Sequence, residues 1–136
     1  MENRYNLDLS VLNPTKTSTS LVGQLRMLEI PNLNVVYEDD TVTCYIHDIG
    51  GTGELLVFHA VVIPSPSVPL LKHYRNIVDH LDVALQERGI TEIEAWVNTD
   101  EQIRYAEFFG FNEMLGELTV NKQQCFPAVY RLRKQL

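Results

Sequence analysis

Residues 1–17 are polar and turn-rich, and hydrophobic residues at helical spacing follow them. Leu21, Leu25 and Leu28 share one face of a predicted helix, which any of the hydroxyl residues 18–20 can cap. Pro31 ends this helix, because the residue before a proline is forced out of the α region. The pattern therefore predicts a first helix between residues 18 and 31.

Alternating residues then predict a β-hairpin. Residues 33–37 and 41–47 have strand-like composition, and acidic residues form the turn between them. In the second strand Val42, Cys44 and Ile46 share one face of the sheet. Glycine-rich residues follow, and because they precede a strand and not a helix, we interpret them as a flexible turn rather than a nucleotide-binding loop.

A long apolar stretch, residues 54–63, is hydrophobic on both faces, which is typical of a central strand covered on both sides. The proline-rich residues 64–69 end this strand. Residues 91–97 predict another strand. Because a helix lies between the two strands, we predict a right-handed parallel strand–helix–strand unit at the centre of the fold.

The helix between these strands has the strongest periodic pattern in the chain. It is predicted to begin near Leu70, and Tyr74, Ile77 and Leu81 lie on its apolar face. The opposite face carries charged residues. Gly89 ends the helix in the left-handed conformation that glycine adopts at low cost.

A short helix and two strands complete the pattern. Thr99 and Gln102 form a capping box for the helix, which Gly110 ends. Residues 111–120 and 128–132 predict the last two strands. The fold class is therefore α/β (α+β), with a mixed sheet of about six strands and three helices in one domain that spans residues 1–136.

Composition excludes several classes of function. The net charge of −7 argues against a nucleic-acid partner, and we interpret the basic residues Arg131, Arg133 and Lys134 as a solvated edge strand. No apolar run is long enough to span a membrane, and the first residues lack an export signal, so we expect a cytoplasmic protein. Cys44 and Cys125 lie far apart and are expected to be inert thiols in a reducing compartment.

Several strings in this order resemble the GNAT superfamily of N-acetyltransferases. Residues 35–42 (VVYEDDTV) resemble its first hairpin, and residues 60–64 (AVVIP) resemble the end of its fourth strand. Residues 87–90 (ERGI) are similar to the end of its third helix, and residues 103–111 (IRYAEFFGF) to its fourth helix and the closing Gly-Phe pair. The resemblance is clearest over residues 33–115. It implies a GNAT-like fold in which acetyl-CoA would lie where the fourth and fifth strands splay apart.

The chain departs from the family's catalytic pattern at two places. The family binds pyrophosphate on a glycine-containing loop at a helix N-terminus, whereas residues 65–72 (SPSVPLLK) contain no glycine, and their prolines lack a backbone donor. Ala106 stands where the family places the tyrosine that protonates the leaving thiolate, and Tyr105 beside it points elsewhere on a helix. Small virion-associated proteins of tailed phages look like GNAT domains with the same losses, and residues 98–110 resemble them. A virion-associated location is therefore an alternative.

The resemblance also implies candidates for each catalytic role. Glu54 resembles the family's base, His59 is an alternative base or a buried core histidine, and Tyr105 is a candidate proton donor. If acetyl-CoA binds, the resemblance implies contacts with Val62, Ile63, Ser65, Ser67, Leu70, Leu71, Lys72 and Asn98. No metal site is predicted, because His73 and His80 share one helix face without a third ligand.

We therefore expect a catalytically degenerate GNAT-like protein that acts through a protein partner or self-association and needs no cofactor. The alternatives are an active N-acetyltransferase that uses acetyl-CoA through an atypical loop, and a small-ligand-binding module. In the degenerate case, aromatic side chains such as Tyr105, Phe108 or Phe109 should narrow the gap between the two splayed strands. The proline-rich residues 64–69 should then lie across the pyrophosphate position.

Overall fold

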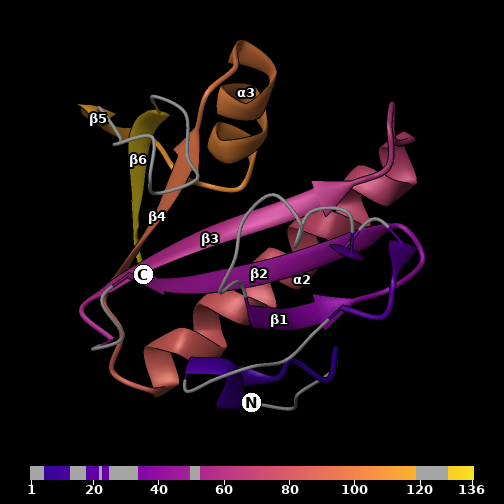
Figure 1. The fold of residues 1–136 in the computed structure, drawn as a ribbon, viewed down its shortest axis with the longest axis horizontal. Coiled ribbons are helices and arrows are strands. Elements are labelled where there is room, and N and C mark those ends of the chain that lie inside the picture. The colour runs from indigo at the N-terminus through magenta and orange to yellow at the C-terminus, as the bar shows by residue number, and fades with distance from the viewer. Residues whose placement is uncertain (1–4, 13–17, 22, 25–33, 50–52, 119–128) are drawn as a thin grey trace.

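A computed structural model describes residues 5–12, 18–21, 23–24, 34–49, 53–118 and 129–136. Six strands form one mixed sheet: β1 (Asn34–Glu38), β2 (Val42–Ile49), β3 (Leu55–Val62), β4 (Glu92–Val97), β5 (Glu113–Leu118) and β6 (Val129–Gln135). Their order in the sheet is β1-β2-β3-β4-β6-β5, and only β3 and β4 are parallel neighbours (Figure 1). The predicted mixed α/β class with a six-stranded sheet is confirmed.

The described residues contain two α-helices, α2 (Val68–Glu87) and α3 (Asp100–Phe108), and the 3-10 helix η1 (Leu9–Leu12). Three helices were expected. A helical turn does begin at Ser20, whose Oγ accepts a hydrogen bond from Gly23 N–H at 2.9 Å, but most of the expected first helix lies outside the described residues. No helix in the described part of the chain is both long and apolar enough to cross a membrane.

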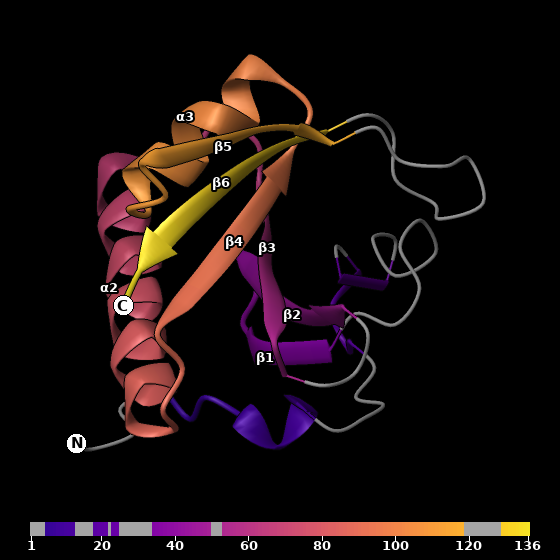
Figure 2. The ribbon, with the colours of Figure 1, turned by 90° about the vertical axis from the view of Figure 1, so that its left-hand side faces the viewer.

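The sheet is covered on both faces near β1 and β2. Helix α2 packs on one face (Figure 2), where its apolar side meets the core residues of the sheet. Residues 18–21, 23 and 24 lie against the other face: Tyr45 Oη donates to Gly23 O at 2.7 Å, and Ser20 Oγ lies 2.8 Å from Thr43 Oγ1. Both faces of β2 are therefore buried, although one carries polar groups.

Helix α2 begins at Val68, two residues before the predicted start. Ser67 caps it by accepting a hydrogen bond from Leu70 N–H at 3.3 Å, and the proline that follows Val68 suits a first helical turn because it needs no donor there. The buried face is the one that the sequence predicts: Tyr74, Ile77 and Leu81 are at most 1% exposed.

Both predicted helix stops are confirmed. Gly89 has a φ of 82° and Gly110 a φ of 99°, the left-handed region in which glycine replaces a strained side chain. The capping box of α3 is present in a modified form, because Thr99 Oγ1 accepts from Gln102 N–H, whereas Gln102 Oε1 accepts from Asn98 N–H at 2.7 Å.

The last strand, β6, lies between β4 and β5. Its basic residues are thus not at an edge, and the prediction of a solvated edge strand is wrong. Strand alternation places Arg131 and Arg133 on one face, where carboxylates bind them. Lys134 lies on the opposite face, 7% exposed, and forms an ion pair with Asp82 of α2.

Candidate functional site

β3 and β4 are paired over a short stretch only. The parallel ladder ends at Phe58 and Ala95, after which β3 continues beside β2 and β4 continues beside β6. Figure 1 shows β4 leaving β3 in the direction of α3. The predicted splay of these two strands is therefore present. It also explains why residues 59–62 of β3 are only half-buried, so the prediction of a strand covered along its whole length is wrong.

The splay leaves backbone groups of β3 without ladder partners. Ile63 N–H donates to Thr41 O at 3.1 Å, and because successive residues of a strand direct their backbone groups to opposite sides, Val61 also faces β2. Ala60 and Val62 consequently direct their N–H and C=O groups toward the gap, where no described residue pairs with them. The splay predicts backbone groups near Val61, Val62 and Ile63 without ladder partners on the side of the gap; those of Val62 lie there, whereas Val61 and Ile63 N–H face β2.

A cavity of about 590 Å³ occupies the gap, and we call it the β3–β4 cleft. Its volume lies within the range of about 300–1,000 Å³ that is usual for ligand sites. Residues of β3, β4 and α3 line it, and aromatic rings form much of the wall: Phe58, Trp96, Tyr105, Phe109 and Phe111. The gap is therefore open and not plugged, although aromatic side chains that were expected to narrow it do line it.

The orientation of α3 explains why the cleft stays open. The ring of Phe109 packs edge-on against Phe58, with 6.2 Å between the ring centres, so it forms a wall and does not enter the space. Phe108 points away from the cleft and is 39% exposed, with the Arg75 guanidinium 5.9 Å from its ring centre. Tyr105 also lines the wall. Of the three aromatic residues expected in the gap, two therefore bound it and one lies outside it.

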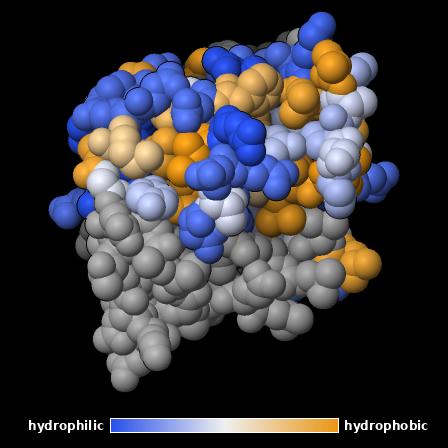
Figure 3. All heavy atoms as spheres, turned by 90° about the horizontal axis from the view of Figure 1, so that it is seen from above, coloured by the Kyte–Doolittle hydropathy of each residue, from blue (hydrophilic) through white to orange (hydrophobic). Residues whose placement is uncertain are grey.

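On the face seen from above, described apolar residues lie among polar ones (Figure 3). Single exposed apolar side chains are ordinary on protein surfaces. The cleft is therefore the feature of this region that a binding function would use.

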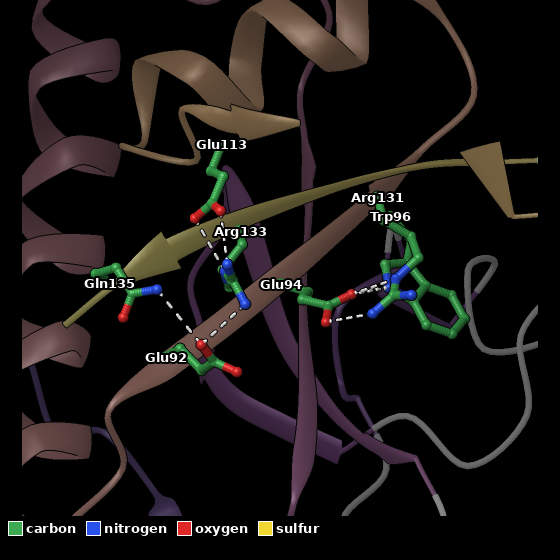
Figure 4. A network of polar contacts seen from close by, with 7 residues as sticks. All are labelled: Glu92, Glu94, Trp96, Glu113, Arg131, Arg133 and Gln135. Atoms are coloured by element: carbon green, nitrogen blue, oxygen red, sulfur yellow. Dashed lines mark hydrogen bonds and ion pairs between the residues drawn. The ribbon is translucent and has the colours of Figure 1, made fainter. Parts of the chain in front are cut away.

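A buried carboxylate fixes the Trp96 side chain in the cleft wall (Figure 4). Glu94 is 4% exposed, and its Oε1 accepts hydrogen bonds from Trp96 Nε1 at 2.9 Å and from Arg131 Nε at 2.7 Å. Its Oε2 accepts from a second guanidinium nitrogen of Arg131 at 2.7 Å. Burial favours a raised pKa for Glu94, but the hydrogen bonds from Arg131 and Trp96 outweigh it and lower the pKa. The carboxylate is therefore charged at neutral pH.

Sequence reasoning missed this three-residue arrangement. The available signal was the alternation of Glu92, Glu94 and Trp96 with apolar residues in one predicted strand. The partner strand was the missing part, because strand pairing between β4 and β6 is not visible in a single sequence. A second ion-pair group lies on the same face, where Arg133 contacts Glu92 of β4 at 3.3 Å and Glu113 of β5 at 2.6 Å (Figure 4).

The three predicted catalytic residues do not come together. His59 and Tyr105 line the cleft, whereas Glu54 is exposed and precedes β3 at the end of the strand opposite the splay. Burial, followed by the negative charge of Glu101, raises the pKa of Tyr105. Its hydroxyl group is therefore protonated at neutral pH. A base at Glu54 and a proton donor at Tyr105 would lie at opposite ends of β3, so they form no joint site.

Most residues that the resemblance implies for acetyl-CoA contacts lie away from the cleft. Val62 lines it, and Ile63 and Asn98 follow the ends of the two splayed strands. Asn98 N–H and Ile63 N–H both already have acceptors within the protein. Ser65 is exposed with a φ of 48°.

The remaining implied residues belong to the start of α2, and none of them is part of the cleft lining. Leu70 N–H and Leu71 N–H, two donors that could bind a phosphate there, already bond to Ser67 Oγ and Ser67 O. The proline at the second helical position has no N–H group. Lys72 is exposed. The helix N-terminus therefore has fewer donors for an anion than an uncapped one.

The histidines considered as metal ligands and the two cysteines can be compared with the structure. Among the described residues, no set of three or more His, Cys, Asp or Glu side chains could hold a metal ion. His73 Nε2 instead lies 2.7 Å from Asp39 Oδ2. Cys44 is buried, which raises the pKa of its thiol, and Cys125 lies outside the described residues.

Comparisons with known proteins give no match. No protein-family model matches the sequence, and none of the curated proteins and none of the solved structures matches it significantly. The resemblance to the GNAT superfamily therefore remains a prediction.

Proposed function

We propose that this protein is a GNAT-like domain without acyl-transfer activity, whose β3–β4 cleft binds an extended segment of a partner protein. One observation carries the proposal. The ladder between β3 and β4 ends at Phe58 and Ala95, and the backbone groups of Ala60 and Val62 face a cavity of about 590 Å³. Ala60 and Val62 are half-buried, so an occupant would exchange water for a hydrogen bond at these groups, a net gain of about 0.5–1.5 kcal/mol each.

An extended peptide has the chemistry that this cleft requires. Its alternating N–H and C=O groups can pair with the free edge of a strand, as in other proteins that add a peptide strand to a sheet. Its apolar side chains would contact aromatic walls such as Phe58 and Phe109. The occupant would thus satisfy backbone groups and bury apolar surface at the same time.

Two features argue against acetyl-CoA as the occupant. The described residues that line the cleft include no Lys or Arg to balance the charge of a pyrophosphate. The N-terminus of α2 is capped by Ser67, and Pro69 removes another donor. The phosphates would therefore meet few of the donors that anion sites use.

Isothermal titration calorimetry with acetyl-CoA tests this part of the proposal. We expect no measurable heat up to about 1 mM ligand, the upper limit of weak specific binding. One-to-one binding in the micromolar range would contradict the proposal.

Selection from a random twelve-residue peptide library tests the partner segment. Ala60→Trp places a large ring in the cleft, and Val68→Trp is the control, because Val68 is 65% exposed and does not line the cleft. We expect the selected peptides to have alternating apolar residues, to bind the wild type and Val68→Trp, and to lose binding to Ala60→Trp. Peptides that bind all three proteins equally would place the site elsewhere.

An active N-acetyltransferase is the second candidate, and one observation favours it. Tyr105 lines the cleft and its pKa is raised, so it carries the proton that a leaving thiolate would need. Turnover of acetyl-CoA with amine acceptors tests this candidate. Activity that is lost in Tyr105→Phe would establish it and would overturn the non-catalytic proposal.

A further inference from the structure

The β3–β4 cleft has an uneven distribution of charge. Among the described residues that line it, Glu101 is the one carboxylate, and none is a Lys or Arg. Glu101 lies four residues before Tyr105 on α3, so the two side chains occupy the same side of the helix. Burial, followed by the charge of Glu101, raises the pKa of Tyr105.

Aromatic side chains also line the cleft. Trp96 and Tyr105 both line the cleft, and the faces of such rings attract cations. Glu94 and Arg131 hold the indole of Trp96 in place, so this part of the wall is preorganised. The exposed carboxylate of Glu101 and the aromatic rings line one cleft, and both attract an ammonium or guanidinium group.

Asp100 and Glu101 both lie in the first turn of α3, where a carboxylate stabilises a helix through its dipole. Of the two, only Glu101 lines the cleft. Phe109 lies eight residues after Glu101, about 12 Å further along the helix direction, near the apolar part of the wall. The cleft therefore has an acidic end and an apolar end.

We infer that the segment bound in the β3–β4 cleft carries a positively charged side chain, Lys or Arg, which lies at Glu101, followed by apolar residues that contact the rings near Phe109. This inference rests on the proposed function. It adds the chemistry of the partner: a basic and apolar segment matches the cleft, and an acidic one does not. The net charge of −7 of the whole chain favours the same partner at longer range.

Three small probes with the same tail test the inference on the intact protein. Octylammonium, octan-1-ol and octanoate share an eight-carbon chain and differ in the charge of the head group. Trp96 is the single tryptophan of the chain and lines the cleft, so its fluorescence emission reports occupancy, and calorimetry confirms each affinity. Glu101→Gln removes the carboxylate. Glu107→Gln is the matched control, because Glu107 is exposed on the same helix and does not line the cleft.

We expect octylammonium to bind about fivefold more tightly than octan-1-ol, and octanoate to bind most weakly. Glu101→Gln should reduce the affinity for octylammonium to that for octan-1-ol, whereas Glu107→Gln should leave it unchanged. Equal binding of all three probes, or an unchanged preference in Glu101→Gln, would overturn the inference and leave the proposed function standing. If none of the probes changes Trp96 emission or produces heat, the cleft accepts no apolar chain, and the proposed function fails as well.

Discussion

The Nζ atom of Lys134 lies 2.8 Å from Oδ1 of Asp82, and this ion pair joins β6 to α2 on the buried face of the sheet. Lys134 also donates a hydrogen bond to Phe109 O at 2.9 Å and lies 4.5 Å from the centre of the Phe111 ring. One buried ammonium group therefore links α2, β6 and the residues that follow α3. It contacts two of the aromatic residues in the cleft wall.

Asp82→Asn should destabilise the protein by about 2–4 kcal/mol, because it leaves the charge of Lys134 buried without a counterion. Lys134→Met is the matched comparison, since it replaces the charged chain by an apolar one of similar shape and should cost less. The free energy of unfolding in urea at neutral pH measures both. A smaller loss in Asp82→Asn than in Lys134→Met would contradict the role of this pair.

Gly110→Ala should destabilise more than Gly89→Ala. Both glycines have positive φ, so each substitution costs about 1–2 kcal/mol of backbone strain. A Cβ atom at Gly110 would also lie 2.9 Å from Cδ of Lys134, whereas a Cβ atom at Gly89 meets no atom within 4 Å. The crowding should add about 1–3 kcal/mol in thermal or urea unfolding. Equal losses would show that Lys134 is free to move.

Acid should weaken the contact between α2 and the turn after β1. Burial favours a raised pKa for Asp39, but hydrogen bonds from His73, Tyr37 and Thr41 outweigh it and lower the pKa to about 2, from an ordinary value of 3.8. The folded state therefore binds a proton at the Asp39 carboxylate less tightly than the unfolded state does. The stabilisation from the hydrogen bonds to Asp39 is complete above its ordinary pKa and is lost as the pH falls toward 2.

Asp39→Asn tests this pH dependence. The difference in unfolding free energy between the wild type and Asp39→Asn should be constant above about pH 5 and should shrink between about pH 4 and pH 2. Tyr37 and His73 face Asp39 and remain in the variant. A difference that grows as the pH falls would reverse the sign of the argument.

Glu94→Ala should release the Trp96 indole from its place in the cleft wall. The variant removes the acceptor of Trp96 Nε1 and both hydrogen bonds to Arg131. We expect a red-shifted Trp96 emission, stronger quenching by acrylamide and weaker binding in the cleft. Glu113→Ala is the control, because it breaks an ion pair with Arg133 on the same face without contacting Trp96, and it should leave the emission unchanged. Unchanged emission in Glu94→Ala would show that other contacts fix the ring.

Local patterns predicted much of the fold. The buried face of α2, the glycine stops at 89 and 110 and the hairpin of β1 and β2 follow from periodicity and backbone chemistry within short segments. The insertion of β6 between β4 and β5 does not follow from them, because it depends on pairing between distant strands. The alternating charges of Arg131 and Arg133 are typical of an exposed edge strand. In the structure, carboxylates on the two neighbouring strands pair with them.

The candidate site was predicted in part. The splay of β3 and β4 was expected from the family resemblance, but whether α3 would fill the gap depended on the rotation of a short helix, which one sequence does not determine. Phe108 and Phe109 are adjacent, yet one is exposed and the other lines the cleft. Glu94 and Trp96 were overlooked for the same reason as β6, since their partner comes from another strand.

The central claim is that a peptide pairs with the free edge of β3, and amide NMR measures this most directly. In a titration with a library-selected peptide, we predict the largest chemical-shift changes at the amides of Ala60 and Val62, which face the cleft. The amides of Val61 and Ile63, which face β2, should change less; Ile63 N–H is bonded to Thr41 O. Changes that alternate in this way would support strand pairing in the cleft. Unchanged amides at Ala60 and Val62, with binding elsewhere on the protein, would contradict the account.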